Sequence, residues 1–96
     1  MKRQEIIKKI TSSLVKHGVP KAYLFGSFAR KEKEYNDIDI AIEPPKGKFS
    51  LLDLIGVEED ISGKVHAKID IVTLRSISPR LKPYIKKDMV LLYESG

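Results

Sequence analysis

The chain lacks cysteine, and its two histidines, His17 and His66, stand far apart in the sequence. Without cysteine there is no disulfide, no thiolate nucleophile and no cysteine-ligated zinc or iron–sulfur site. Two isolated histidines do not make a multi-histidine metal site. The hydrophobic runs are only a few residues long, too short to span a bilayer, and the first residues are charged, unlike a signal peptide. We therefore expect a cytoplasmic protein without a membrane segment.

The 96 residues are 42% hydrophobic and 32% charged, a composition typical of one small folded domain covering residues 1–96. The net charge of +5 is spread unevenly. Residues 1–21 hold six basic residues and one acidic residue, whereas residues 22–74 hold seven basic and ten acidic residues. Basic flanks around an acidic centre suit a polyanionic substrate or partner. A lysine-rich solvated surface is the simpler explanation of the charge alone.

Hydrophobic periodicity predicts helices that alternate with strands. Isoleucine and leucine recur at three- and four-residue spacing over residues 3–17, which indicates a helix that ends before Gly18 and Pro20. Strands are predicted at 21–25, 37–42 and 66–74, and an edge strand at 89–93. Between them, a brief helix is predicted from Gly26 to about 33, and a longer one at about 51–61 that begins at a Ser50–Asp53 capping box and ends at Ser62-Gly63. The last predicted helix runs from Ser78-Pro79 to about Lys87. This order predicts an α/β fold with helices packed on a small mixed sheet of about four strands.

Two aspartates, Asp37 and Asp39, alternate with isoleucines in the clearest of these strands. Residues two apart in a strand project from the same face, about 6.5–7 Å apart at the backbone. A third aspartate, Asp70, lies between Ile69 and Ile71 of another predicted strand. If the two strands are neighbours, three carboxylates share one face, where they can bind divalent cations and repel one another without them. The alternative is that strand alternation merely places polar residues in solvent.

A glycine–serine pair, Gly26-Ser27, stands at the predicted junction between a strand and a helix. Glycine lets a ligand approach the backbone closely, and the amides at a helix start attract phosphate. Ser27 can hydrogen-bond a phosphate oxygen or act as an ordinary N-cap. Arg30, one helical turn later, is a further candidate contact for a phosphate. Together with the three aspartates, this pair predicts a site for metal ions and phosphate.

These motifs resemble the nucleotidyltransferases of the DNA polymerase β superfamily, and the resemblance extends over nearly the whole chain. Within that superfamily the chain resembles the minimal nucleotidyltransferases of the MntA type, which are antitoxins paired with HEPN-domain toxins. The segments that carry the resemblance are Gly26–Arg30, Asn36–Ile42, Phe49–Ile55, Ile69–Thr73 and Ser78–Leu81.

The resemblance implies a two-Mg²⁺ reaction that transfers AMP from ATP to a hydroxyl and releases pyrophosphate. It implies that Asp37 and Asp39 ligate both metal ions, and that Asp70 completes the shell of the catalytic ion and helps to deprotonate the acceptor. Gly26 and Ser27 are then the residues that hold the triphosphate. In the MntA-type subgroup the acceptor is a tyrosine of the cognate HEPN toxin, an RNase that AMPylation silences.

The chain departs from the family pattern around the segment that joins these motifs. Nine residues separate Ser27 from Asp37, where ten are common. Lys31 stands where the family usually has glycine, and Asn36 replaces a common serine. The shorter spacing falls in a predicted surface turn, where changes of length are tolerated.

Three other functions stay open from the sequence. The first is nucleotidyl transfer to the hydroxyl of a small molecule, although 96 residues leave little room for a domain that binds such an acceptor. The second is a non-catalytic antitoxin that neutralises its partner by contact. The third is a small basic protein that binds nucleic acid, which is not expected because the central aspartates repel phosphates when no metal is bound.

Overall fold

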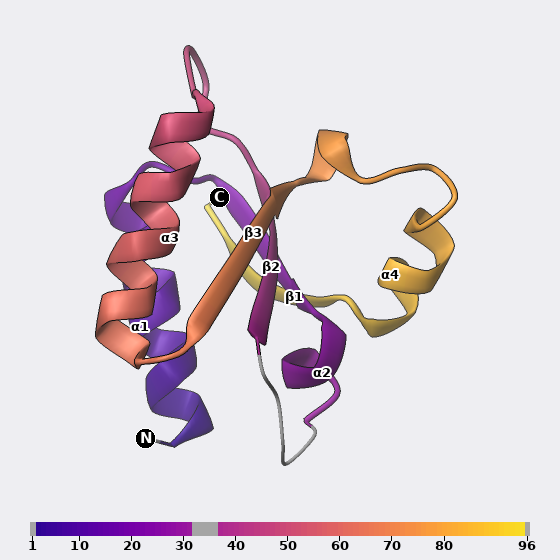
Figure 1. Ribbon diagram of the computed structural model, residues 1–96, viewed down its shortest axis with the longest axis horizontal. Helices are drawn as coiled ribbons and strands as arrows, with labels where there is room; N and C mark the ends of the chain where they lie inside the picture. The colour runs from indigo at the N-terminus through magenta and orange to yellow at the C-terminus, as the bar shows by residue number, and fades with distance from the viewer. Residues whose placement is uncertain (1, 32–36, 96) are drawn as a thin grey trace.

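The computed structural model describes residues 2–31 and 37–95. Its elements in chain order are α1 (Arg3–Lys16), β1 (Lys21–Phe25), α2 (Gly26–Ala29), β2 (Asp37–Glu43), α3 (Leu51–Val65), β3 (Lys68–Thr73), the 3-10 helix η1 (Leu74–Ser76), α4 (Lys82–Asp88) and β4 (Val90–Glu94). The strands form one mixed sheet in the order β3-β2-β1-β4 (Figure 1). Strand β1 is antiparallel to β2 and β4, whereas β2 and β3 are parallel. The predicted α/β fold with a four-stranded mixed sheet is confirmed.

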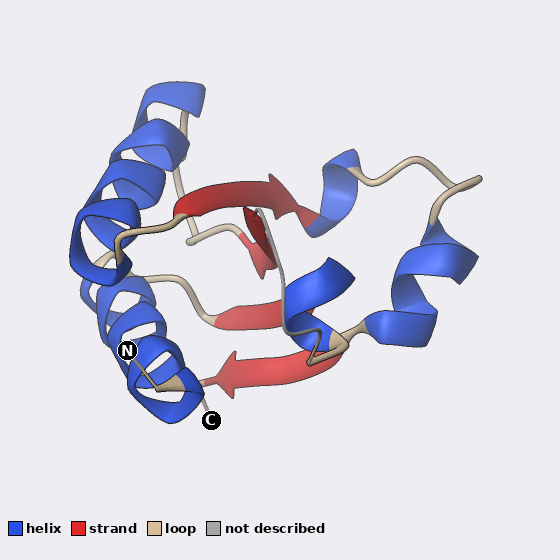
Figure 2. Cartoon of the chain, turned by 60° about the horizontal axis from the view of Figure 1, so that its bottom comes forward, coloured by secondary structure: helices blue, strands red, loops and turns tan. Residues whose placement is uncertain are grey.

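The two long helices, α1 and α3, cover one face of this sheet, and η1 and α4 lie on its other side (Figure 2). The isoleucines of β2 and β3 pack with both helices in one core, where Ile38 and Ile40 are fully buried and Ile71 is 3% exposed. Because successive side chains of a strand point to opposite faces, the aspartates between these isoleucines point away from the core. The isoleucine stripe therefore fixes which face carries the carboxylates.

Polar contacts also join α1 to α3. The His17 ring, at the C-cap of α1, shares a 3.0 Å hydrogen bond with the Asp60 carboxylate of α3. The Lys64 ammonium donates a hydrogen bond of 2.9 Å to the hydroxyl of Ser13, which is fully buried. The sequence assigned no role to His17, because its partner lies 43 residues further along the chain.

Helix α3 begins as predicted and ends later than predicted. The Ser50 hydroxyl accepts a hydrogen bond from the Asp53 amide, and the Asp53 carboxylate accepts one from the Ser50 amide, so the capping box is complete. The predicted break at Ser62-Gly63 is wrong, since the helix continues to Val65 and ends at a left-handed His66. Burial of Ile61 and Val65 on the core side offsets the cost of about 1 kcal/mol for a glycine inside a helix.

The C-terminal elements also differ in detail from the predicted ones. The predicted strand at 66–74 is shorter, because Leu74 already belongs to η1. The predicted helix from Ser78-Pro79 begins only at Lys82, so that Pro83 lies in its first turn, where its missing N–H is not needed, and produces no internal kink. The last strand pairs only with β1 and lies at the edge of the sheet, as predicted. Among the described residues, no helix has the length and apolar character needed to cross a membrane.

Candidate active site

The three aspartates come together through the pairing of β2 with β3. Asp39 lies directly beside Asp70 in the parallel register, and Asp37 lies beside Lys68. Paired residues on adjacent strands project from the same face, as do residues two apart on one strand. Asp37 and Asp39 are half-buried and Asp70 is exposed. The structure thus places all three carboxylates on one face of two neighbouring strands, as the sequence predicted.

The turn at Gly26 forms the rim of this face. Gly26 has a φ of +74°, in the left-handed region that side chains other than glycine adopt at a cost. Phe25 pairs with Asp39 across β1 and β2, which brings the Asp39 carboxylate against the turn. A Cβ at Gly26 would collide with Oδ2 of Asp39. Both the backbone conformation and the close approach therefore require glycine at this position.

Asp39 is the electrostatic centre of the cluster. Partial burial raises the pKa of the Asp39 carboxyl above its ordinary value, and the negative charges of Asp70 and Asp37 raise it further. The Arg30 guanidinium acts in the opposite direction, but its effect on the pKa is the smallest of the four. The cluster therefore holds unfavourable negative charge that a cation would neutralise.

The residues of this face fit a divalent cation by their chemistry. Carboxylate oxygens are the ligands that Mg²⁺ prefers, and these three come from a rigid pair of strands. Within residues 2–31 and 37–95, no group of three acidic or histidine side chains lies close enough together to hold one ion. The Asp39 carboxylate lies against Gly26 instead. The carboxylate face therefore supplies the donors, without showing a formed metal site.

The two other predicted phosphate contacts lie at the end of β1. Ser27 follows Gly26 in α2 and is half-buried. Arg30 caps the C-terminus of α2, and its Nη1 donates a hydrogen bond of 2.8 Å to Oδ2 of Asp88 in α4. The Arg30 side chain thus connects α2 to α4, a contact that the sequence did not reveal. Its contact with a phosphate stays a prediction.

Lys31 explains one departure from the family pattern. Its φ is +60°, so the position where nucleotidyltransferases usually carry glycine is left-handed in this chain as well. A lysine in this conformation destabilises the native backbone relative to a glycine. The rest of the shortened spacing, including Asn36, lies outside the described residues.

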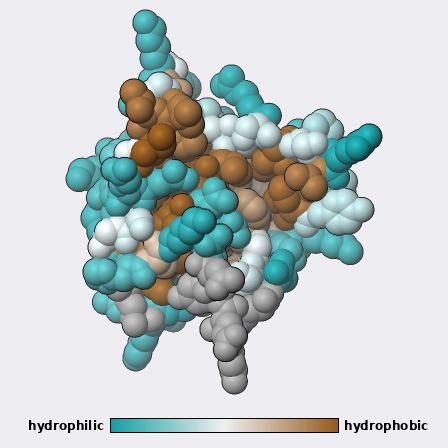
Figure 3. Space-filling view, viewed as in Figure 1, coloured by the Kyte–Doolittle hydropathy of each residue, from teal (hydrophilic) through white to brown (hydrophobic). Residues whose placement is uncertain are grey.

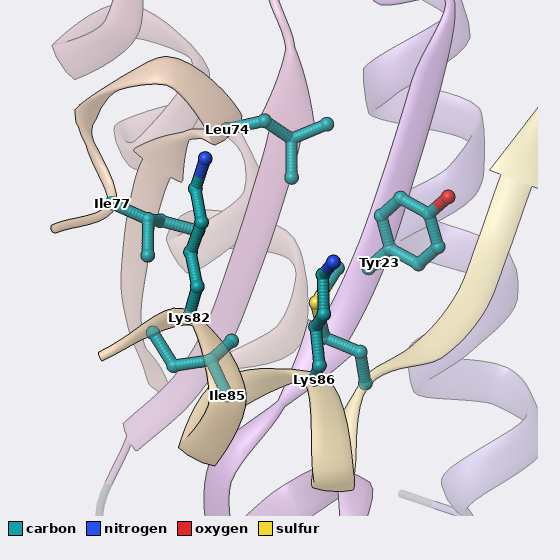
Figure 4. Close-up of a pocket in the computed structure, with 7 residues that line it drawn as sticks. Tyr23, Leu74, Ile77, Lys82, Ile85 and Lys86 are labelled. Carbon is teal, nitrogen blue, oxygen red and sulfur yellow. The ribbon is translucent and has the colours of Figure 1, made fainter. Parts of the chain in front are cut away.

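A cavity of about 370 Å³ opens between β1, η1 and α4 (Figure 4). The residues described as lining it are Tyr23, Leu74, Ile77, Lys82, Ile85, Lys86 and Met89. Tyr23 belongs to the carboxylate face, because it lies two residues before Phe25, the partner of Asp39. The sequence analysis singled out none of these residues. The available signal was the four-residue spacing of Lys82 and Lys86, which places two ammonium groups on one side of a helix.

Known proteins resemble this chain over nearly its whole length. The family model described as "Polymerase beta, Nucleotidyltransferase" matches residues 8–96. A protein of Methanocaldococcus jannaschii, named as an inferred protein adenylyltransferase, is 44% identical over 91 residues, which cover 94% of this chain and 97% of that protein. A second inferred protein adenylyltransferase of the same organism is 38% identical over 92 residues, 93% of each chain.

Solved structures show the same fold. An inferred minimal nucleotidyltransferase superimposes with a TM-score of 0.77 at 26% identity, over 94% of this chain and 95% of that one. A chain of a toxin–antitoxin complex with AMP-PNP gives a TM-score of 0.78 at 24% identity, over 93% of this chain and 73% of that one. A chain from the complex of a tri-AMPylated Shewanella oneidensis HEPN toxin with MNT antitoxin gives a TM-score of 0.77 at 23% identity, over 98% of this chain and 74% of that one. With the matched family model and the relative at 44% identity, these findings show that the chain belongs to the polymerase β nucleotidyltransferase family, the enzyme class that its motifs predicted.

Proposed function

We propose that this protein is a Mg²⁺-dependent adenylyltransferase that transfers AMP from ATP to a hydroxyl of a partner protein. The observation that carries the proposal is the group of three carboxylates on one face, beside the turn at Gly26. The inferred protein adenylyltransferases of M. jannaschii support AMP as the transferred group and a protein as the acceptor. A related fold in complex with AMP-PNP supports an adenine nucleotide as the donor.

In this reaction an oxygen of the acceptor forms a bond to the α-phosphorus of ATP, and the bond from that phosphorus to the pyrophosphate oxygen breaks. Asp37 and Asp39 would hold both Mg²⁺ ions, and Asp70 would hold the catalytic one. The ions supply neutralisation of charge on the transferred phosphate and on the leaving pyrophosphate. Asp70 helps to remove the acceptor's proton, and Ser27 with the Gly26 backbone holds the triphosphate.

The acceptor we propose is a tyrosine of a cognate HEPN-domain toxin, so that the protein acts as an antitoxin. The structure of a tri-AMPylated HEPN toxin with an MNT antitoxin supports this partner through the shared fold. A chain of this size leaves little surface for a small acceptor, whereas a partner protein brings its own tyrosine to the open carboxylate face. The active complex is then a hetero-oligomer.

The test is to incubate the protein with ATP, Mg²⁺ and a candidate HEPN-domain partner, followed by mass spectrometry of that partner. We expect added AMP groups on a tyrosine, and loss of partner RNase activity in parallel. The variant Asp39→Asn should bind the partner and add no AMP. Neutralisation of the partner by this variant, without any added AMP in the wild type, would show a non-catalytic antitoxin instead.

A further inference from the structure

The two edges of the sheet differ in how their backbone groups are protected. Strand β3 forms one edge and β4 forms the other. The Ile71 amide of β3 donates a hydrogen bond of 2.8 Å to the Glu58 carboxylate of α3. Since β2 lies on one side of β3 only, Glu58 occupies an amide on the free side of this strand. Lys68 and Asp70 add exposed charges to β3, and charged side chains on an edge strand oppose its pairing with another chain.

Strand β4 lacks this protection. Its five residues, Val90–Glu94, include neither proline nor lysine, the residues that commonly protect an edge strand. Among residues 2–31 and 37–95, β1 is the single strand paired with β4, and Figure 2 shows no helix that runs along the outer side of β4. Leu92 lies at a bulge and has no register partner in β1. The outward backbone groups of β4 can therefore pair with another strand.

The side chains of β4 are apolar on both faces of this edge. Val90 is 48% exposed and Leu91 is 51% exposed, and successive residues of a strand point to opposite faces. Other exposed leucines, Leu51 and Leu52, gather over the start of α3 (Figure 3), but a helix offers no backbone ladder to a second strand. Exposed apolar side chains on both faces of an open edge suit the addition of a strand whose own side chains cover them.

The charges that flank β4 favour one orientation of the added strand. Lys87, in the last turn of α4, is exposed just before β4, and the Glu94 side chain is 52% exposed at its end. Within the chain, Asp88 pairs with Arg30 and Glu94 pairs with Lys21. In an antiparallel pairing of two copies, the start of each β4 lies beside the end of the other, so Lys87 approaches Glu94 of the second copy. A parallel pairing brings like charges together instead, which is unfavourable.

We infer that β4 pairs with β4 of a second copy of this chain in antiparallel order, so that two four-stranded sheets become one. Both copies contribute the same surface, and the pairing therefore closes on a dimer. An open filament requires β4 to pair with β3, whose free edge Glu58 protects. The two-fold axis is perpendicular to the joined sheet, so the carboxylate faces of both copies lie on the same side of it. The inference does not depend on the proposed function.

The test is analytical ultracentrifugation of the full chain without a partner protein. At a chain concentration of about 1 mM, even a dissociation constant of about 0.1 mM gives mostly dimer, so the wild type should sediment with about twice its mass of 10.9 kDa. Leu91→Lys buries a charge of each copy in the interface and should weaken the dimer at least about 100-fold. Leu52→Lys is the matched control. It makes the same change at an exposed leucine of α3 and should leave the dimer intact.

Two further measurements examine the orientation and the edge. Lys87→Glu places an acid beside Glu94 of the second copy and should weaken the dimer about tenfold, whereas Lys46→Glu, the same change in the loop before α3, should not. In the wild type, hydrogen exchange of the β4 amides should slow as the chain concentration rises, whereas that of the β3 amides should stay constant. Circular dichroism of each variant checks that the fold is kept.

Several outcomes overturn the inference. A wild type that stays monomeric at about 1 mM does so, as does a dimer that a folded Leu91→Lys leaves intact. A dimer that only Leu52→Lys disrupts assigns the interface to the start of α3. Where Leu91→Lys does not fold, the other two measurements decide. A dimer that Lys87→Glu does not weaken, with β4 exchange independent of concentration, then contradicts the pairing of β4 with its copy.

Discussion

At the scale of single residues, the negative charge of Asp39 lowers the stability of the native state, and the proposed reaction needs that charge. Its raised pKa shows that the native state holds this carboxylate under desolvation and repulsion from Asp70 and Asp37. Such a cost persists at a site only where another property of the protein requires it. We regard the binding of a cation as that property.

We predict that Asp39→Asn raises the melting temperature of the metal-free protein by less than about 5 °C at pH 7 and abolishes AMP transfer. The substitution removes the charge and keeps the shape of the side chain. It also loses the attraction of Arg30, which is the smallest of the influences on this carboxylate. Thermal unfolding of both proteins in a chelator measures the difference, and a lower melting temperature for the variant contradicts the argument.

The advantage of Asp39→Asn should depend on pH with a definite sign. Because the pKa of Asp39 is raised from 3.8, the native state keeps this proton to higher pH than the unfolded chain does. The wild type therefore loses stability as the pH rises from about 4 through the raised pKa. The difference between variant and wild type should shrink as the pH is lowered toward 4, which unfolding in urea at several pH values records.

We expect Gly26→Ala to destabilise the protein by at least about 1–2 kcal/mol, because alanine adopts a positive φ at that cost and its Cβ also collides with Asp39. Gly18→Ala is a useful control. Gly18 has a similar φ of +76° and no atom within 4 Å of an added Cβ, so it carries the backbone cost alone. Equal losses of stability in the two variants, measured in urea, would show that the Asp39 carboxylate moves aside without cost.

The candidate site was predictable where it depends on strand alternation. Asp39 and Asp70 each lie between two isoleucines, and Asp37 directly precedes Ile38. That local pattern fixes the face of all three aspartates once the strands are neighbours. The ion pair of Arg30 with Asp88 and the lysines of α4 were not predictable in the same way. They depend on how α4 returns across the sheet, 58 residues after Arg30.

At the scale of secondary-structure elements, the start of α3 was predictable and its end was not. The Ser50–Asp53 capping box is a contact across three residues, which the sequence shows directly. The end depends on burial of Val65 against the sheet, which local signals such as Ser62-Gly63 do not report. The first turn of α4 was misplaced by a few residues, because Ser78-Pro79 begins a turn, closed by hydrogen bonds from the Leu81 and Lys82 amides to the Ser78 carbonyl, that precedes the helix.

We predict that Ser50→Ala lowers the free energy of unfolding by about 1 kcal/mol, the usual loss for an N-cap hydroxyl. The Ser50 amide and hydroxyl hold the pKa of Asp53 below its ordinary value of 3.8, so the stabilisation that Asp53 supplies is present at neutral pH and lost as the pH falls through the lowered pKa. Ser50→Thr keeps the hydroxyl and should cost less. Chemical denaturation of both variants at pH 7 makes the comparison.

At the scale of the whole molecule, ligands should stabilise the protein more than any surface contact does. A ligand that binds only the native state at 100 times its dissociation constant adds about 2.7 kcal/mol to the free energy of unfolding. We therefore expect Mg²⁺ with ATP to raise the melting temperature by several degrees, and Mg²⁺ with adenosine to raise it less. A melting temperature that responds to neither metal nor nucleotide would count against the site.

The strand order has a consequence for how the chain assembles. The unit β2-α3-β3, which carries all three aspartates, is contiguous in the sequence, whereas β1 is flanked on one side by β4, whose Glu94 pairs with Lys21. Local pairings form sooner than distant ones, because closing a long loop costs entropy before any contact is gained. The acidic strands should thus gain protection from hydrogen exchange early in refolding, and the cavity between β1, η1 and α4 should be completed last. A newly made chain would then acquire its acidic centre before α4 and β4 cover the rest of that face.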